Sequence, residues 1–168
     1  MTARKVMLLG EIGVGKSSIV ERLVFDRFDL EYKPTIGVDV YRYEIAASEA
    51  RPGVSLIIWD TDGNFGDTIF RHVYMKEASA ALVVGDLSRR ETLETMTRLG
   101  HGFEEALPGR HISFILNKID LVGALGGEEF EFTLSRSGRD IVKTSAKTGE
   151  NVQYAFLHTA DAIIRRGH

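Results

Sequence analysis

A glycine-rich stretch near the N-terminus constrains this chain more than any other feature. Residues 10–17 read Gly-Glu-Ile-Gly-Val-Gly-Lys-Ser, which fits the pattern Gly-x-x-x-x-Gly-Lys-Ser, and they follow the apolar run Val6–Leu9. A strand that leads into such a loop and then into a helix lets backbone N–H groups close around phosphate groups. The glycines leave room for that close approach. The sequence therefore predicts a phosphate-binding loop and a helix that begins at Lys16.

This loop also predicts which side chains contact the phosphates. The Lys16 ammonium should reach the β- and γ-phosphates, and the Ser17 hydroxyl should be a ligand of Mg²⁺. The helix adds unpaired N–H groups and the positive end of its dipole. We expect the phosphates to be bound by Gly13, Val14, Gly15, Lys16, Ser17 and Ser18.

Composition excludes several other classes of protein. A chain of 168 residues is long enough for one domain with a buried core, and a net charge of −3 gives no reason to expect a nucleic-acid partner. There is no cysteine, which removes disulfides and thiolate metal sites. The five histidines lack the spacing of a metal-binding motif, so we expect no metal role for them. We expect a cytoplasmic monomer with no evident lipid anchor.

Strand-like and helix-like segments alternate along the chain. Apolar runs predict strands at residues 6–9, 54–59, 80–84, 112–116 and 141–143, and the alternation in Tyr41–Ile45 predicts an edge strand. Helical periodicity follows at 16–26, 69–74, 93–107, 128–134 and 152–163, although glycines at 100 and 102 weaken the third of these. The alternation predicts an α/β fold, a three-layer sandwich with a mostly parallel six-stranded sheet.

Polar segments follow the ends of these strands. In sheets of this kind, ligands bind beyond the carboxyl ends of the strands. The phosphate loop, Asp60, Asn117–Asp120 and Ser145–Lys147 each follow a strand. We therefore expect them to converge on one edge of the sheet and to form a single site.

The segment Asn117-Lys118-Ile119-Asp120 indicates which base this site accepts. A carboxylate can accept two hydrogen bonds from the N1–H and the exocyclic amino group of guanine. Adenine lacks that pair of donors, so Asp120 should select GTP over ATP. A phosphate-loop kinase or an ATPase is the alternative, and Asp120 with Ser145-Ala146-Lys147 argues against it.

Taken together, these ordered motifs resemble those of the small GTPases of the Ras superfamily, nearest to the Rab and Ras types. The resemblance spans nearly the whole chain and implies a P-loop NTPase fold, with residues 1–168 forming a single G domain. It implies GTP and GDP as ligands, Mg²⁺ as cofactor and hydrolysis of GTP to GDP and phosphate. It also implies that effector and regulator proteins bind through residues 29–41 and 62–76.

The resemblance assigns further residues to the guanine and the ribose. Phe28 would cover the edge of the guanine ring, and Asn117 would bind the base. Lys118 would brace the ribose and the phosphate loop, the Ala146 N–H would meet the guanine carbonyl, and Lys147 would lie over the base. The complete expected set is Phe28, Asn117, Lys118, Asp120, Ser145, Ala146 and Lys147.

The resemblance likewise assigns residues to the metal and to catalysis. Tyr32 would close over the phosphates, and the Gly63 N–H would contact the γ-phosphate. Thr35 would ligate Mg²⁺ in the GTP state. The expected metal ligands are Ser17, Thr35 and Asp60, the last through a water molecule. The expected catalytic residues are Lys16, Thr35, Gly63 and Asn64.

The chain departs from the family pattern close to the γ-phosphate. The family carries Ala-Gly-Gln-Glu where this chain has Asp62-Gly63-Asn64-Phe65, and a smaller residue where it has Ile12. The family glutamine orients the attacking water, and the amide of Asn64 falls one methylene short. Ile12 could obstruct an arginine supplied by a partner. We expect slow hydrolysis; the alternatives are another residue that positions the water, or a GTP-bound binding or scaffold module with negligible hydrolysis.

Overall fold

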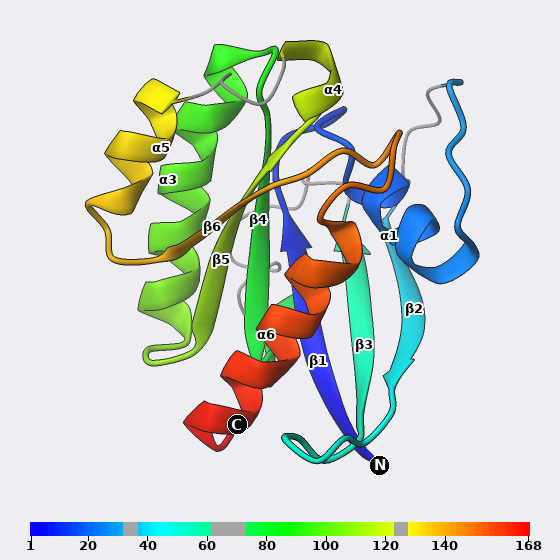
Figure 1. Cartoon of the computed structure of the whole chain (residues 1–168). Coiled ribbons are helices and arrows are strands. Elements are labelled where there is room, and N and C mark those ends of the chain that lie inside the picture. The colour runs from blue at the N-terminus through cyan, green and yellow to red at the C-terminus, as the bar shows by residue number, and fades with distance from the viewer. Residues whose placement is uncertain (32–36, 62–72, 123–127) are drawn as a thin grey trace.

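The computed structural model describes residues 1–31, 37–61, 73–122 and 128–168. In these ranges one six-stranded sheet has the order β2-β3-β1-β4-β5-β6 (Figure 1). Only β2 is antiparallel to its neighbour, β3, and the other four pairs are parallel. The predicted α/β class, the mostly parallel sheet and the edge position of β2 are therefore confirmed.

The elements follow the predicted alternation along the chain. The strands are β1 (Thr2–Leu9), β2 (Val38–Ile45), β3 (Val54–Thr61), β4 (Ala80–Asp86), β5 (His111–Asn117) and β6 (Asp140–Lys143). The helices are α1 (Lys16–Phe25), α3 (Arg90–Ala106), α4 (Ile119–Val122), α5 (Glu128–Ser135) and α6 (Val152–Arg166). No helix within the described ranges is long and apolar enough to cross a lipid bilayer.

The sheet is buried on both faces because its central strands are apolar at nearly every position. In β1, Val6 and Leu8 belong to one hydrophobic cluster, and Met7 and Leu9 belong to the other. Helices α1 and α6 complete the first cluster, and α3 completes the second (Figure 1). This three-layer packing holds the carboxyl ends of the parallel strands along one edge, where the loops of the site begin.

Some boundaries differ from the sequence predictions. Helix α3 spans Gly100 and Gly102, as predicted, but begins three residues earlier than expected, at Arg90. A Cβ atom on Gly100 would lie 3.0 Å from two ring atoms of Phe114, so glycine at this position lets the helix approach β5. Strand β3 continues one residue past Asp60, and the short helix α4 was not predicted. Residues 69–72 of the helix expected at 69–74 lie outside the described residues.

Candidate functional site

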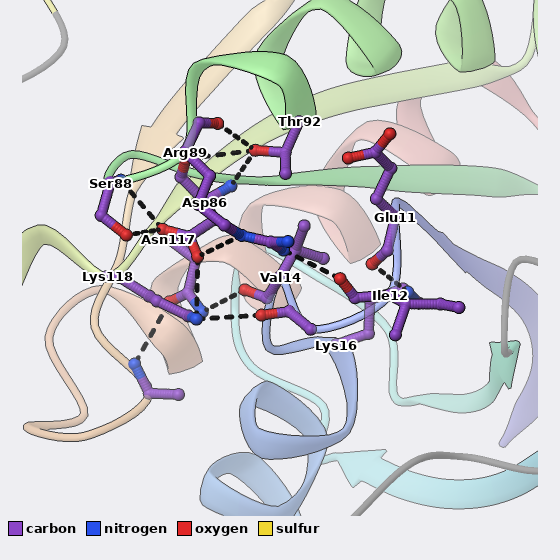
Figure 2. A network of polar contacts seen from close by, with 12 residues as sticks. Glu11, Ile12, Val14, Lys16, Asp86, Ser88, Arg89, Thr92, Asn117 and Lys118 are labelled. Atoms are coloured by element: carbon purple, nitrogen blue, oxygen red, sulfur yellow. Dashed lines mark hydrogen bonds and ion pairs between the residues drawn. The ribbon is translucent and has the colours of Figure 1, made fainter. Parts of the chain in front are cut away.

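The loops at the strand ends meet through direct hydrogen bonds. The loop after β1 (residues 10–15, the phosphate loop) is held from outside by three side chains, one from the segment between β4 and α3 and two from the end of β5 and the residue after it (Figure 2). The pairs are Arg89 Nη2 to the Ile12 carbonyl at 2.8 Å, Lys118 Nζ to the Gly13 carbonyl at 2.9 Å, and Asn117 Nδ2 to the Val14 carbonyl at 3.0 Å. Three successive carbonyl groups are thus bound on the outer side of the loop.

Lys16 binds the same loop from the inside. Its Nζ donates to the carbonyl oxygens of Gly10 at 2.8 Å and of Glu11 at 3.0 Å, and the residue is only 6% exposed. Both of these acceptors are neutral carbonyl groups of the phosphate loop, so the two hydrogen bonds set the position of the ammonium group at the loop. The predicted phosphate-binding lysine therefore lies within the curve of the loop.

Gly15 explains how Asn117 can reach the loop. The backbone of Gly15 has φ +102°, in the left-handed region that favours glycine, and a Cβ atom there would lie 2.4 Å from Asn117 Nδ2. Any larger residue would push the Asn117 side chain away from the Val14 carbonyl. Helix α1 starts at the next residue, Lys16, as the sequence predicted.

Asp86, at the end of β4, fixes two of the side chains that hold the loop. It is 1% exposed, and its Oδ2 lies 2.8 Å from Lys118 Nζ and 3.1 Å from Arg89 Nε. Ser88 donates to Oδ1 from its backbone N–H at 2.9 Å and from its hydroxyl at 2.6 Å. Burial alone would raise the pKa of Asp86, but the hydrogen bonds from Lys118 and Ser88 outweigh it and lower the pKa. Asp86 is therefore a buried carboxylate that stays ionised.

Asn117 also connects the phosphate loop to the segment after β6. Its Oδ1 accepts from the Thr144 hydroxyl at 3.0 Å and from the Ala146 N–H at 3.3 Å, while its Nδ2 binds Val14. This side chain uses both ends of its amide to join three strand-end loops. The predicted contact of the Ala146 N–H with a guanine carbonyl stays a prediction.

The predicted base-selecting carboxylate is oriented by a serine. Asp120 is exposed, and its Oδ1 accepts from the Ser145 hydroxyl at 2.7 Å. The Ser145 oxygen accepts from the Thr148 N–H at 3.1 Å, so its proton is directed toward Asp120. Ser145 is fully buried. A rigid, buried hydroxyl therefore sets the direction of the exposed carboxylate.

Arg22, on the polar side of α1, supports the loop that contains Ala146 and Lys147. Its Nε donates to the Ala146 carbonyl at 2.9 Å and its Nη2 to the Lys147 carbonyl. Its Nη1 lies 3.0 Å from Asp26 Oδ1. No motif pointed to Arg22, although a charged residue on the face of α1 opposite its apolar positions was a usable signal.

Ser17 and Asp60 lie together on the other side of the phosphate loop. The Ser17 hydroxyl donates to Asp60 Oδ2, and Asp60 is fully buried at the end of β3. A hydroxyl and a carboxylate beside a phosphate-binding loop are the hard oxygen ligands that Mg²⁺ takes in proteins. This pair therefore fits the predicted cofactor.

The remaining predicted residues are divided between the described and the undescribed parts of the chain. Phe28 packs against the core cluster that α1 and α6 share, Ser18 lies half-buried in the first turn of α1, and Lys147 is exposed. Ile12 is 49% exposed on the phosphate loop. The predicted residues outside the described ranges are Tyr32, Thr35, Asp62, Gly63, Asn64 and Phe65.

Comparison with known proteins agrees with this geometry. The family model described as the Ras family matches residues 5–165. Ras-related protein RABF2a of Arabidopsis thaliana is 31% identical over 164 residues, covering 96% of this chain and 81% of the relative. Ras-related protein Rab-18 of Caenorhabditis elegans is 32% identical over 168 residues, covering 98% and 82%. The chain therefore belongs to the Ras family and is a Rab-like small GTPase, one of the GTP-binding molecular switches of the Ras superfamily.

Proposed function

We propose that residues 1–168 form a single G domain that binds GTP and GDP with Mg²⁺ and hydrolyses GTP slowly. The observation that carries this proposal is the Asn117 side chain, which joins the phosphate loop to the loop that contains Ala146. A site in which one amide connects the phosphate side to the base side suits a ligand that has both parts. The order of its loops along the sheet matches the order of phosphates and base in a nucleotide.

In the proposed reaction, water attacks the γ-phosphorus, the bond to the β–γ bridging oxygen breaks, and GDP and phosphate leave. Lys16 and the N–H groups of residues 13–18 stabilise the negative charge that develops on the phosphate oxygens. Ser17, Thr35 and Asp60, the last through water, would hold Mg²⁺, which supplies further positive charge to the phosphates. Contacts of Thr35 and Gly63 with the γ-phosphate side would order the two segments that contain these residues in the GTP state.

Slow hydrolysis follows from the residues beside the γ-phosphate. The Asn64 side chain is one methylene shorter than the family glutamine, and a positioning error of about 1 Å can cost on the order of 100-fold in rate. Ile12 presents an exposed, branched side chain on the phosphate loop. Both features support a low intrinsic rate and an activating partner that works differently or is absent.

Base selectivity tests the nucleotide site. Purified protein with Mg²⁺ is titrated with fluorescent GDP, and unlabelled GTP or ATP competes. We expect GTP to compete at concentrations at least about 100-fold lower than ATP, and Asp120→Ala to remove most of that preference. Glu49→Ala, which removes an exposed carboxylate far from the site in sequence and outside its hydrogen bonds, is the control. Equal competition by ATP, or an unchanged preference in Asp120→Ala, refutes the proposal.

Single-turnover hydrolysis tests the rate. We expect Asn64→Gln and Ile12→Gly, separately or together, to speed GTP hydrolysis by about 10- to 100-fold over the wild type. If neither substitution speeds hydrolysis, the cause assigned to the slow rate is wrong.

A second candidate function is a GTP-bound binding module that scarcely hydrolyses its ligand. The exposed Ile12 favours it, because a bulky residue on the phosphate loop leaves nucleotide binding possible while it hinders an activating arginine. The nucleotide retained on purification and a hydrolysis assay lasting many hours separate the two functions. Retained GTP with no release of phosphate supports the module, and retained GDP supports the GTPase.

Effector and regulator proteins would bind through residues 29–41 and 62–76. Large apolar side chains are exposed in the described parts of both segments, since Leu30 is 82%, Val40 54% and Val73 59% exposed. Exposed apolar residues grouped near a ligand site are typical of protein-binding surfaces. The expected monomeric state and cytoplasmic location stay predictions.

A further inference from the structure

Two histidines and an aspartate from three different elements meet away from the nucleotide loops. His111 begins β5, Asp140 begins β6, and His158 lies in the middle of α6 (Figure 1). The base-binding loops follow the other ends of these two strands. One ligand atom of each of the three residues lies within 4.8 Å of those of the other two. Their wide separation in sequence hides this cluster from any motif search.

The spacing of these atoms suits a tetrahedral metal ion. Asp140 Oδ2 lies 2.9 Å from His158 Nε2 and 3.7 Å from His111 Nε2. Ligands about 2.0–2.2 Å from a tetrahedral Zn²⁺ are themselves separated by about 3.3–3.6 Å. The two observed distances fall on either side of that range, and His111 Nε2 also lies 2.9 Å from the Ser113 hydroxyl oxygen, a contact that a bound ion would replace.

The surroundings of the histidines also suit metal binding. His111 is only 3% exposed, so its imidazole is held in place by the surrounding core, and the neutral imidazole is the form that binds metals. The Tyr154 ring stacks on the His158 ring with centroids 5.7 Å apart, which holds the second imidazole in place. Arg165 and Arg166 are close enough to His111 to oppose a cation. We therefore expect micromolar affinity.

We propose that His111, Asp140 and His158 form a site for Zn²⁺ or a similar transition-metal ion, with a fourth position left for water. Two imidazole nitrogens, one carboxylate oxygen and one open position form a ligand set that Zn²⁺ takes in proteins. This site is separate from the nucleotide and from Mg²⁺, and the proposed GTPase function does not depend on it. A bound ion would connect the starts of β5 and β6 to α6.

Calorimetry tests the proposal directly. ZnCl₂ is titrated into protein saturated with GDP and Mg²⁺, so that the nucleotide site is occupied throughout. We expect one Zn²⁺ per chain with a Kd in the range of about 1–20 μM. At about 100-fold excess over that Kd, Zn²⁺ should raise the melting temperature by about 5–10 °C. Co²⁺ in its place should give the intense visible absorption of a tetrahedral complex.

Asp140 and His158 are partly exposed, so substitutions at these two positions should leave the fold intact. His158→Gln and Asp140→Asn should each weaken Zn²⁺ binding by at least about 10-fold and abolish the Co²⁺ absorption, with GDP binding unchanged. His101→Gln is the matched control, because His101 is 75% exposed beside Glu105 and lies outside the cluster. No binding below about 100 μM Zn²⁺, or equal affinity in the double variant His158→Gln/Asp140→Asn, overturns the proposal.

Discussion

The ammonium nitrogen of Lys118 lies 2.8 Å from a carboxylate oxygen of Asp86 and 2.9 Å from the carbonyl oxygen of Gly13. Lys118 also has φ +67°, a backbone conformation that non-glycine residues rarely adopt. The lysine is therefore held at both its backbone and its ammonium group. Because Asp86 is buried and comes from a different strand, it sets the position of Lys118 relative to the phosphate loop.

Replacing Asp86 with asparagine should weaken nucleotide binding although Asp86 is not expected to touch the nucleotide. Asp86→Asn keeps the shape of the side chain and removes the charge that holds Lys118, and a hydrogen bond to a charged group contributes about 1.5–3 kcal/mol. We expect GDP to dissociate about 10-fold faster or more, measured by displacement of fluorescent GDP. Ser88→Ala, which removes one donor to Asp86 and leaves Lys118 in place, should change the rate by less than about 3-fold. An unchanged rate in Asp86→Asn contradicts this role.

Asp86 should also make the stability of the fold depend on pH in acid. Its pKa in the folded chain lies below the ordinary value of 3.8. A carboxylate with a lowered native pKa contributes stability that is complete above the unfolded-state pKa and is lost as pH falls through the native pKa. The difference in melting temperature between wild type and Asp86→Asn should therefore be constant above about pH 5 and shrink below about pH 4. Circular dichroism across this range measures it, and a difference that widens in acid would contradict the assignment.

Comparing Gly15→Ala with Gly138→Ala separates the cost of a steric clash from the cost of backbone strain. The added methyl group would lie 2.4 Å from Asn117 Nδ2 in a backbone with φ +102°, so the variant should lose detectable GDP binding and melt at a lower temperature. Gly138→Ala has a similar backbone, with φ +71°, but nothing within 4 Å of the new methyl group. It should cost only the backbone strain of about 1–2 kcal/mol and keep GDP binding. Equal effects in the two variants would show that contact with Asn117 is unimportant.

Arg22→Gln should accelerate nucleotide release by loosening the loop that contains Ala146 and Lys147. The substitution removes the guanidinium that donates to the carbonyls of both residues. We expect GDP to dissociate about 3- to 10-fold faster, since a partly exposed charged hydrogen bond contributes less than a buried one. Arg27→Gln is the control, because Arg27 is exposed and its contacts with Glu21 at 3.9 Å and with the Phe25 ring lie outside the loop that contains Ala146 and Lys147. Matching rates in the two variants would refute this role of Arg22.

The sequence alone was sufficient to predict the fold and the loops that form the site. Continuous apolar runs predicted the central strands, because burial on both faces excludes polar residues there. Since parallel strands end at one edge, the predicted convergence of the phosphate loop, Asp60, Asn117–Asp120 and Ser145–Lys147 is confirmed by the contacts of Ser17 with Asp60 and of Asn117 with Val14 and Ala146.

Contacts between side chains distant in sequence could not be predicted in the same way. Asp86 was not predicted as a residue of the site, because its partner Lys118 is brought to it by the pairing of β4 with β5. Gly100 was interpreted as a weak point of a helix, whereas it allows close packing on Phe114. Such roles depend on which elements become neighbours, and a local pattern does not contain that information.

The outer contacts of the phosphate loop have a consequence for the thermodynamics of ligand binding. Because Arg89, Lys118 and Asn117 bind three successive carbonyls, contacts within the chain itself hold the curvature of the loop. Such preorganisation reduces the conformational entropy lost on association, so more of the electrostatic attraction for the phosphates remains as affinity. The loop therefore acts as a preformed receptor.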